Sequence, residues 1–254
     1  FIFLCFIMIS KSEIKFIKSL NLQKFREKNN VFKVEGWRTI KEFLSSDYKL
    51  IDLFVTSGFI TNDPFLDSIP FRVIKQMDLH RISSFKTPNQ TLAIFQKKKT
   101  DYKLSFLKEN LVIALENISN PGNLGSIIRT ADWFGVRNIV CSLKSVDVYN
   151  PKVIQASMGS LSRVSVSYTD FADFLLQLKK ANVQTFGADL NGESFYGKKI
   201  QKGVIFFGKE SSGLSKNTCS LVSQKIKIPT KNELCDSLNL SVSFGIIMSE
   251  LNRT

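Results

Sequence analysis

The run at residues 111–115, Leu-Val-Ile-Ala-Leu, is apolar at every position. A strand with one face in water alternates apolar and polar side chains, whereas a parallel strand covered on both faces can be apolar throughout. Beyond this run, short apolar segments alternate with segments of helical period, which predicts an α/β fold with a mainly parallel sheet. The expected strands are 111–115, 138–141, 164–166, 183–188, 203–207 and 225–228, and the expected helices are 124–134, 151–159, 171–181, 216–222 and 238–251.

The first part of the chain contains the same kinds of pattern in shorter segments. We expect helices at 11–20, 36–44 and 76–83 and strands at 31–34, 50–55, 71–74 and 91–95. The polar and basic stretch 96–102 has the composition of a linker. We therefore expect an α/β domain at 8–95, a linker at 96–109 and a second domain at 110–254.

The chain is strongly basic, with a formal net charge of +13 over 254 residues. Lys and Arg outnumber acidic residues by 18 to 10 in residues 1–105 and by 17 to 12 in the remainder. Such an excess suits a polyanionic partner such as nucleic acid, because each cation set against a phosphate releases counterions. It suits equally a basic surface that only keeps the protein in solution, so charge alone leaves both interpretations open.

The cysteines and the single histidine argue against a metal centre. Cys5, Cys141, Cys219 and Cys235 are far apart and form no Cys-x-x-Cys pair, which favours a reducing cytoplasm over a disulfide framework or a zinc site. His80 has no second histidine to share a metal with, and we expect it on the surface.

The apolar residues 1–9 are too few to span a bilayer, carry no basic leader region and precede no small-residue cleavage site. We expect no membrane association. Because Met8 opens a segment that continues into a basic helix, we expect it to be the first residue of the native protein.

Three short segments in the second half place Gly, Asn or Ser directly after an apolar run, where a strand passes into a loop. Polar backbone at strand ends is where α/β proteins bind ligands. The segments are Asn120-Pro-Gly-Asn-Leu-Gly-Ser-Ile-Ile-Arg129, Phe206-Phe-Gly-Lys-Glu-Ser-Ser-Gly-Leu-Ser215, and Ile228-Pro229 followed by Ser237-Leu-Asn-Leu-Ser241.

Each segment makes a structural prediction of its own. Gly122 and Gly125 should form a sharp turn with Arg129 one turn into the following helix, so that its guanidinium reaches back over the loop. Glu210 should need a cationic or hydrogen-bonding partner at its strand end, and Arg129 is the expected one. Ser237 should cap the last helix.

Taken singly, these segments also fit ordinary strand-to-helix junctions. A dinucleotide-binding turn would need Gly-x-Gly-x-x-Gly and an acidic residue at the end of the second strand, and 138–142 contains no acid. Together and in this order, the three segments resemble the motifs of the SpoU/TrmH family of RNA 2′-O-methyltransferases, the knotted SPOUT enzymes. The segment Phe32-Lys-Val-Glu-Gly36 is similar to one in the ribosomal-protein-like RNA-binding domain that precedes the catalytic domain in many members.

The resemblance implies a trefoil-knotted second domain, an exception to the rule that chains do not thread loops. It implies S-adenosyl-L-methionine as cofactor, rRNA or tRNA as substrate, no metal, and a homodimer with its active site near the subunit interface. Backbone groups matching Gly208, Ile228 and Leu238 would hold the adenine. The loop at 230–236 is one residue longer than is usual in the family, which leaves its cofactor contacts open.

The implied reaction is methyl transfer to a ribose 2′-hydroxyl. Arg129 would be the leading catalytic residue, Asn123 and Glu210 would position it or the substrate, and Ser237 and Asn239 would complete the pocket. Whether Arg129 acts as a base or as a phosphate clamp is open, although a guanidinium, with a pKa above ~12 in water, suits the second role better. The alternative is a catalytically silent RNA-binding SPOUT protein that acts in ribosome assembly.

Overall fold

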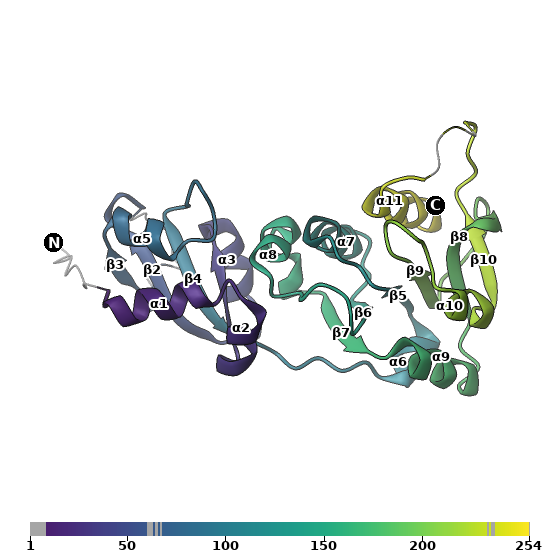
Figure 1. Cartoon of the computed structure of the whole chain (residues 1–254), viewed down its shortest axis with the longest axis horizontal. Coiled ribbons are helices and arrows are strands. Elements are labelled where there is room, and N and C mark those ends of the chain that lie inside the picture. Colours follow the sequence, from purple (N-terminus) through teal and green to yellow (C-terminus); the bar gives the residue numbers. More distant parts are fainter. Residues whose placement is uncertain are drawn as a thin grey trace. The chain divides into compact units, whose positions relative to one another are not determined.

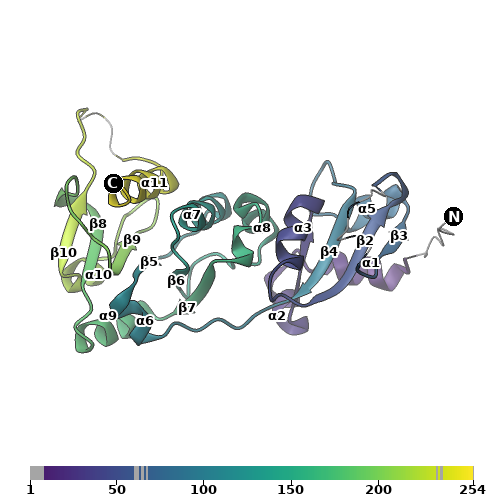
Figure 2. The same cartoon turned by 180° about the vertical axis from the view of Figure 1, so that it is seen from behind.

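A computed structural model of the chain describes residues 9–59, 63, 66, 68–232, 234 and 237–253. Cys5, Met8 and Cys235 lie outside these residues, as does part of the 230–236 loop. The chain divides into two compact units, each with its own sheet (Figures 1 and 2). Unit 1 comprises residues 1–98 and 149–162, and unit 2 comprises residues 99–148 and 163–254.

The sheet of unit 1 has four strands in the order β1-β4-β2-β3. Central β4 runs antiparallel to both β1 and β2, and β3 is parallel to β2. The strands are β1 (Val31–Glu35), β2 (Leu50–Thr56), β3 (Arg72–Ile74) and β4 (Thr91–Gln96), and the helices are α1 (Lys11–Ser19), α2 (Gln23–Asn29), α3 (Trp37–Leu44), α5 (Gln76–Ile82) and α8 (Pro151–Ser157), with short 3-10 turns η1 (Ser57–Phe59) and η2 (Ser160–Ser162).

Helices cover both faces of this sheet. Ile17 of α1 and Leu79 of α5 are buried with the β-strand residues Phe54 and Leu92 on one face. On the other face an aromatic cluster surrounds Phe32, whose ring lies 5.6 Å from that of Phe43 and 4.4 Å from that of Tyr149. The segment 149–162, which the sequence places in the second domain, therefore packs within unit 1.

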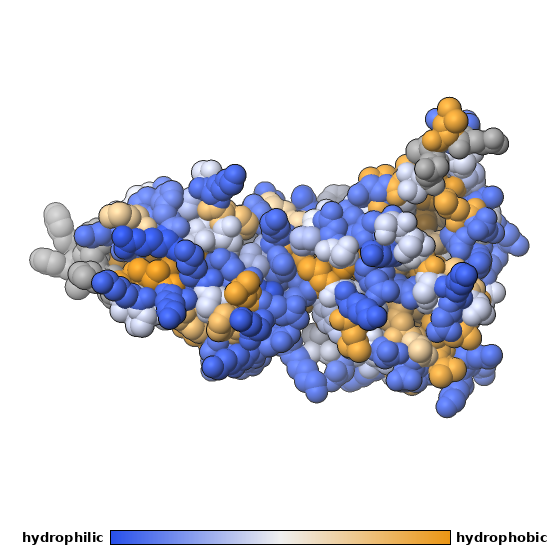
Figure 3. Space-filling model, viewed as in Figure 1, coloured by the Kyte–Doolittle hydropathy of each residue, from blue (hydrophilic) through white to orange (hydrophobic). Residues whose placement is uncertain are grey.

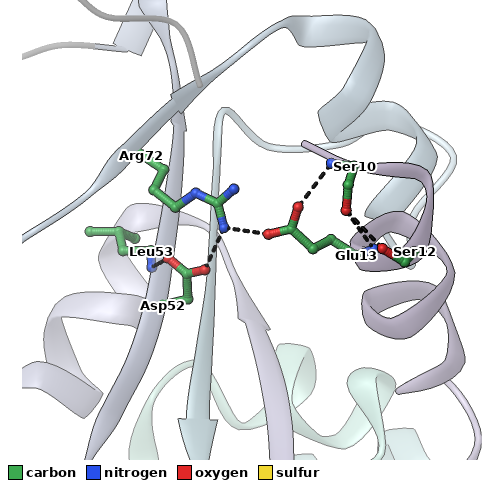
Figure 4. Close-up of polar contacts among 6 residues, drawn as sticks. All are labelled: Ser10, Ser12, Glu13, Asp52, Leu53 and Arg72. Atoms are coloured by element: carbon green, nitrogen blue, oxygen red, sulfur yellow. Dashed lines mark hydrogen bonds and ion pairs between the residues drawn. The ribbon is translucent and has the colours of Figure 1, made fainter. Parts of the chain in front are cut away.

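An arginine ties α1 to the strands. Arg72 Nη1 donates to Glu13 Oε1 at 2.8 Å and to Asp52 Oδ2 at 3.0 Å (Figure 4). Glu13 also accepts from the backbone of Ser10 and closes a capping box there. The hydrogen bonds from Arg72 and Ser10 lower the pKa of Glu13 from 4.5 to about 2. Its stabilising contribution is therefore complete above pH 4.5 and is lost as the pH falls toward 2.

The sheet of unit 2 has six strands in the order β10-β8-β9-β5-β6-β7, and every neighbouring pair is parallel. This confirms the prediction of an α/β fold with a mainly parallel sheet. Its strands are β5 (Leu111–Leu115), β6 (Asn138–Ser142), β7 (Ser165–Thr169), β8 (Thr185–Ser194), β9 (Gly203–Phe207) and β10 (Gln224–Lys227), and its helices are α6 (Leu104–Glu109), α7 (Pro121–Trp133), α9 (Phe171–Lys180), α10 (Lys216–Leu221) and α11 (Leu240–Leu251).

Alternate residues of the central strands pack into two hydrophobic cores, one on each face of the sheet. Val112, Ala114 and Phe206 pack against Leu107 of α6 and Phe174 of α9. The opposite side is covered by α7 and α11, which pack on each other, and the ring of Phe207 meets that of Phe244 in α11 at 5.4 Å (Figure 1). Burial on both faces explains why β5 is apolar throughout.

Two helix boundaries differ from those expected. Helix α7 begins at Pro121, because the side chain of Asn120 accepts from the backbone of Gly122 and Asn123 and proline suits the first helical position. Gly122 and Gly125 are thus helical and form no turn, and Arg129 lies about two turns into the helix. Helix α11 begins at Leu240 with Asn239 as its cap, so the prediction that Ser237 caps it was wrong.

Two helices were not predicted. Helix α2 follows α1 almost directly, and α6 occupies the second half of the expected linker and buries Leu107 in the core of unit 2. No helix in the described part of the chain is both long and apolar enough to cross a bilayer. The trefoil knot stays a prediction.

Lys33 of β1 generates a test of the core of unit 1. The side chain is 2% exposed and donates to the carbonyl of Ile82 at 2.6 Å. Burial lowers its pKa from 10.5 to about 8. Below pH 8 the folded and unfolded states both carry the proton, whereas between about pH 8 and 10.5 only the unfolded state keeps it, so stability rises with pH.

We expect the free energy of unfolding of the wild type, relative to Lys33→Met, to rise by roughly 2–3 kcal/mol between pH 7.5 and pH 10, because one pKa unit corresponds to about 1.4 kcal/mol. Denaturant unfolding at each pH measures this difference. Lys49→Met, which removes an exposed amine, is the control for the loss of one charge. A difference that stays constant over this range would contradict the burial of a titrating amine.

Candidate active site

The carboxyl ends of the parallel strands in unit 2 border an open cleft of about 1250 Å³. Its lining comes from the segments that follow β9 and β10, from the middle of β8 and from the first residues of α11. Gly208, Ile228 and Leu238, the three residues implied as cofactor contacts, all line it. Glu210 and Ser237 line it as well, so five of the predicted site residues meet at one cleft.

The loop after β5 is held by buried polar groups. Glu116, 6% exposed, accepts from the backbone N–H of Ser215 at 2.9 Å and from the hydroxyl of Thr218 at 3.0 Å. Asn117 takes the left-handed conformation, with φ of 56°, and its N–H donates to Ser142 Oγ at 2.8 Å. These bonds fix the start of α7 beside the loop that follows β9.

Two side-chain hydrogen bonds join the three predicted motif segments. Asn123 Nδ2 donates to Glu210 Oε1 at 3.1 Å, and Asn239 Nδ2 donates to Asn123 Oδ1 at 3.1 Å. The side chain of Asn123, 7% exposed, therefore connects the loop after β9 to the cap of α11. Asn239 also caps α11. Glu210 Oε1 also accepts from the N–H of Asn120, the cap of α7, at 3.4 Å.

The expected ion pair between Arg129 and Glu210 does not form. Arg129 is exposed on α7 and makes no hydrogen bond or ion pair with the described residues, whereas Glu210 is bound by Asn123 and Asn120. The cause is the early start of α7, which carries Arg129 about 12 Å along the helix from Pro121. Glu210 Oε2 is buried and has no hydrogen-bond partner among the described residues.

A tight loop shapes the floor of the cleft. The backbone groups of Lys209 and Gly213 exchange hydrogen bonds at 3.0 and 2.8 Å, which folds the segment back on itself. A Cβ atom on Gly208 would lie 2.0 Å from the carbonyl carbon of Gly213. Only glycine fits at position 208, since a methyl group there would push the loop out of place.

Sequence reasoning missed the part of the lining that comes from β8. The pairing of β8 with β10 shifts register between Lys225 and Ile226, so residues 188–192 leave the ladder, and residues 188–191 line the cleft. Burial alone would raise the pKa of Asp189, but bonds from the N–H of Asn191 and from Cys219, with the charge of Lys225, lower it below its ordinary value. The acid directly after the expected strand 183–188 was the available signal.

The donors and acceptors of the cleft fit the cofactor that the resemblance implies. S-adenosylmethionine carries hydrogen-bond donors on its amino group, its ribose and its adenine, and Glu210 Oε2 is a buried acceptor without a partner among the described residues. The backbone groups of Gly208, Ile228 and Leu238 make no hydrogen bond within the described part of the chain and remain free for a ligand. No cluster of three metal-ligating side chains occurs among the described residues.

Comparison with known proteins agrees with the family resemblance found in the sequence. Residues 110–249 match the family described as the SpoU rRNA Methylase family, and residues 11–93 match the MRM3-like substrate binding domain. The 23S rRNA (guanosine-2′-O-)-methyltransferase RlmB of Blochmanniella floridana is 34% identical over 242 residues, which cover 87% of this chain and 94% of that protein.

Solved structures are similar along the whole chain. A TrmH-family protein from Porphyromonas gingivalis has a TM-score of 0.85 and 30% identity, with 96% of this chain and 98% of that chain covered. An AdoMet-bound rRNA methyltransferase from Sinorhizobium meliloti shares the fold, with a TM-score of 0.83, 24% identity and 96% of each chain covered.

The motif segments identified in the sequence, the cleft at which they meet and the match over more than half of the chain agree. The resemblance that the sequence suggested is confirmed. This chain belongs to the SpoU rRNA methylase family.

Proposed function

We propose that this chain transfers a methyl group from S-adenosyl-L-methionine to a ribose 2′-hydroxyl of rRNA. The observation that carries the proposal is the pair of hydrogen bonds through Asn123, which joins Glu210 and Asn239 at a cleft lined by Gly208, Ile228 and Leu238. The RlmB relative, an rRNA 2′-O-methyltransferase by name, supports rRNA as the substrate. We place this activity in the cytoplasm.

The residues of the chain have separate tasks in this reaction. The bound cofactor supplies an electrophilic methyl group, and the protein aligns the hydroxyl with it. Backbone groups of Gly208, Ile228 and Leu238 hold the adenine, and Glu210 accepts a hydrogen bond from a donor in the cleft. Arg129 binds the phosphate next to the target ribose and stabilises the negative charge that develops on the hydroxyl oxygen.

The two sequence domains divide the work. We propose that residues 8–95 bind RNA, that 96–109 connect the domains, and that 110–254 carry out the transfer. Lys11, Lys15 and Lys18 are exposed along α1 and form no ion pair with described residues. In Figure 3 the surface near α1 is mostly hydrophilic around one apolar patch, and Phe16, 38% exposed, belongs to this helix. Lysines beside an aromatic ring suit a nucleic acid.

We further propose a homodimer through α11. Its outward stripe is apolar, with Leu238 47% exposed just before the helix and Val242 50% exposed within it. An apolar surface of this kind on a soluble protein is a candidate interaction site. The active-site residue Asn239 caps this same helix. A second copy of the chain that packed on α11 would therefore place both active sites near the interface.

Replacing Arg129 tests the catalytic assignment. We expect Arg129→Ala to lower kcat for RNA methylation by about two orders of magnitude, or ~3 kcal/mol, as is typical when one charge-stabilising donor is lost. Arg129→Lys should recover little, because an ammonium lacks the planar fork. Calorimetry should show unchanged cofactor affinity, since Arg129 does not line the cleft.

Arg253→Ala, which removes another exposed arginine, is the matched control and should keep the wild-type rate. If Arg129→Ala methylated at the wild-type rate, its catalytic role would be wrong while the family assignment stood. A wild-type protein that bound RNA but did not bind S-adenosylmethionine would instead favour the silent RNA-binding alternative.

Replacing Gly208 tests the cofactor site. We expect Gly208→Ala to lower the affinity for S-adenosylmethionine at least tenfold, about 1.4 kcal/mol, because its methyl group displaces the 209–213 loop. Gly135→Ala is the control, since its φ of 75° makes alanine strained there too, but nothing lies within 4 Å of the added Cβ. Cofactor binding that survives in Gly208→Ala would place the adenine elsewhere.

Replacing Val242 tests the dimer. We expect the wild type to have twice the 28.8 kDa mass of one chain by light scattering, and Val242→Glu to have the mass of one chain. Leu176→Glu on α9 is a matched control, because Leu176 is 49% exposed but lies on the opposite side of the sheet. The same mass for wild type and Val242→Glu would exclude this interface.

A further inference from the structure

Trp133 is the most exposed aromatic side chain in the described part of the chain, at 86%. It is one of only two tryptophans, and the other, Trp37, donates to Asp63 and packs edge-on against Phe59. A side chain this large and this exposed leaves most of its apolar surface in water.

Trp133 shares a face of α7 with Arg129. The two residues are four apart, so they are neighbours on the helix surface and about 6 Å apart along its axis. Gly122 and Ser126 precede them on the same face and leave room beside the two long side chains. The exposed face of α7 thus ends in a cation followed by an aromatic ring.

Two further cations are bound to Asp132, the residue that precedes Trp133 in the chain. Asp132 Oδ1 accepts from Arg137 Nη1 at 3.0 Å, and Asp132 Oδ2 accepts from Arg163 Nε at 2.9 Å. The side chains of Arg137 and Arg163 remain 54% and 41% exposed. One carboxylate therefore holds two guanidinium groups in place while their outer edges face water.

The chemistry of this patch identifies its partner. An apolar protein partner would gain little from a ring that follows Arg129 on the helix and is next in sequence to the Asp132 that binds Arg137 and Arg163, because desolvation of these cations would offset the burial of the indole. An unpaired nucleic acid offers a base to stack on the ring and phosphates for the guanidinium groups. We propose that Trp133 is a stacking platform for an unpaired base of the substrate RNA, adjacent to the nucleotide that is methylated, with Arg137 and Arg163 binding the flanking phosphates.

This proposal rests on the proposed function, since Arg129 is taken to hold the phosphate of the target nucleotide. A strand held there continues past Trp133 one helical turn away. The substrate segment must then be single-stranded at this point, in a loop or a bulge, because a base within a duplex does not expose its face. Trp133 would thus select unpaired RNA without reading its sequence.

The test uses Trp133 as its own reporter. In the full-length Trp37→Phe protein Trp133 is the only tryptophan, and a single-stranded oligouridylate of about 10 nucleotides should quench its fluorescence. A duplex of the same length should quench it much less. Trp133→Ala should lower the affinity for the oligouridylate about tenfold, and Trp133→Phe should keep most of it, because stacking is worth about 1–3 kcal/mol per base.

Tyr196→Ala is the control for losing an exposed aromatic, since Tyr196 is 52% exposed on another segment of unit 2. In methylation assays Trp133→Ala should raise KM for RNA and leave kcat at saturating RNA nearly unchanged. Absence of quenching, or equal losses in Trp133→Ala and Tyr196→Ala, would overturn the proposal. A change of molar mass in Trp133→Ala would also overturn it, by assigning the ring to a protein interface.

The same assays separate the proposal from the proposed function. Quenching by the oligouridylate in a wild type that transfers no methyl group would leave the platform standing and refute the reaction. Methylation without quenching would support the reaction and refute the stacking role of Trp133.

Discussion

The arrangement of the candidate active site depends on the side-chain amide of Asn123. Asn123 donates to Glu210 and accepts from Asn239, each at 3.1 Å, and so holds together three chain segments that are far apart in sequence. Aspartate at this position could not donate to a second carboxylate, and leucine could neither donate nor accept. Because Asn123 is 7% exposed, both bonds form away from bulk water, where an unmade bond is costly. The relative positions of the loop after β9, the start of α7 and the cap of α11 follow from this side chain.

The sheet and the glycines then give the cleft its shape. Six parallel strands bring their carboxyl ends to one edge, which is where the loops after β5, β9 and β10 meet. Gly208 lets the 209–213 loop fold back without a clash, and Gly192 lets β8 pass close to β10, since a Cβ atom on Gly192 would lie 2.6 Å from the backbone nitrogen of Ile226. The backbone groups of Ile228 and Leu238 make no hydrogen bond to the described residues, and Glu210 Oε2 is the only buried side-chain polar atom of the cleft without a partner among them.

The sequence was most informative where local chemistry decides the outcome. Strands such as β5 and β9 follow from apolar runs, and Gly208, Ile228 and Leu238, which the resemblance implied as cofactor contacts, all line one cleft. The errors arose where one local signal outweighed another. Glycine suggested a turn at 122–125, but the cap of Asn120 and the ring of Pro121 start the helix earlier, and this moved Arg129 out of reach of Glu210. The lining from residues 188–191 depends on a register shift between β8 and β10, a non-local feature that no periodicity encodes.

The boundary between the two units also could not be predicted from the sequence. Residues 149–162 lie inside the span that matches the methylase family, yet Tyr149 packs at 4.4 Å from Phe32, and its hydroxyl lies 3.2 Å from that of Tyr48. Val153 and Ile154 are buried in the same unit. A fragment that began at the expected linker would therefore keep this segment and lose the partners that bury it. The spans that match the substrate binding domain and the methylase family are separate in sequence, but the hydrophobic effect joins one piece of the second span to the core of unit 1.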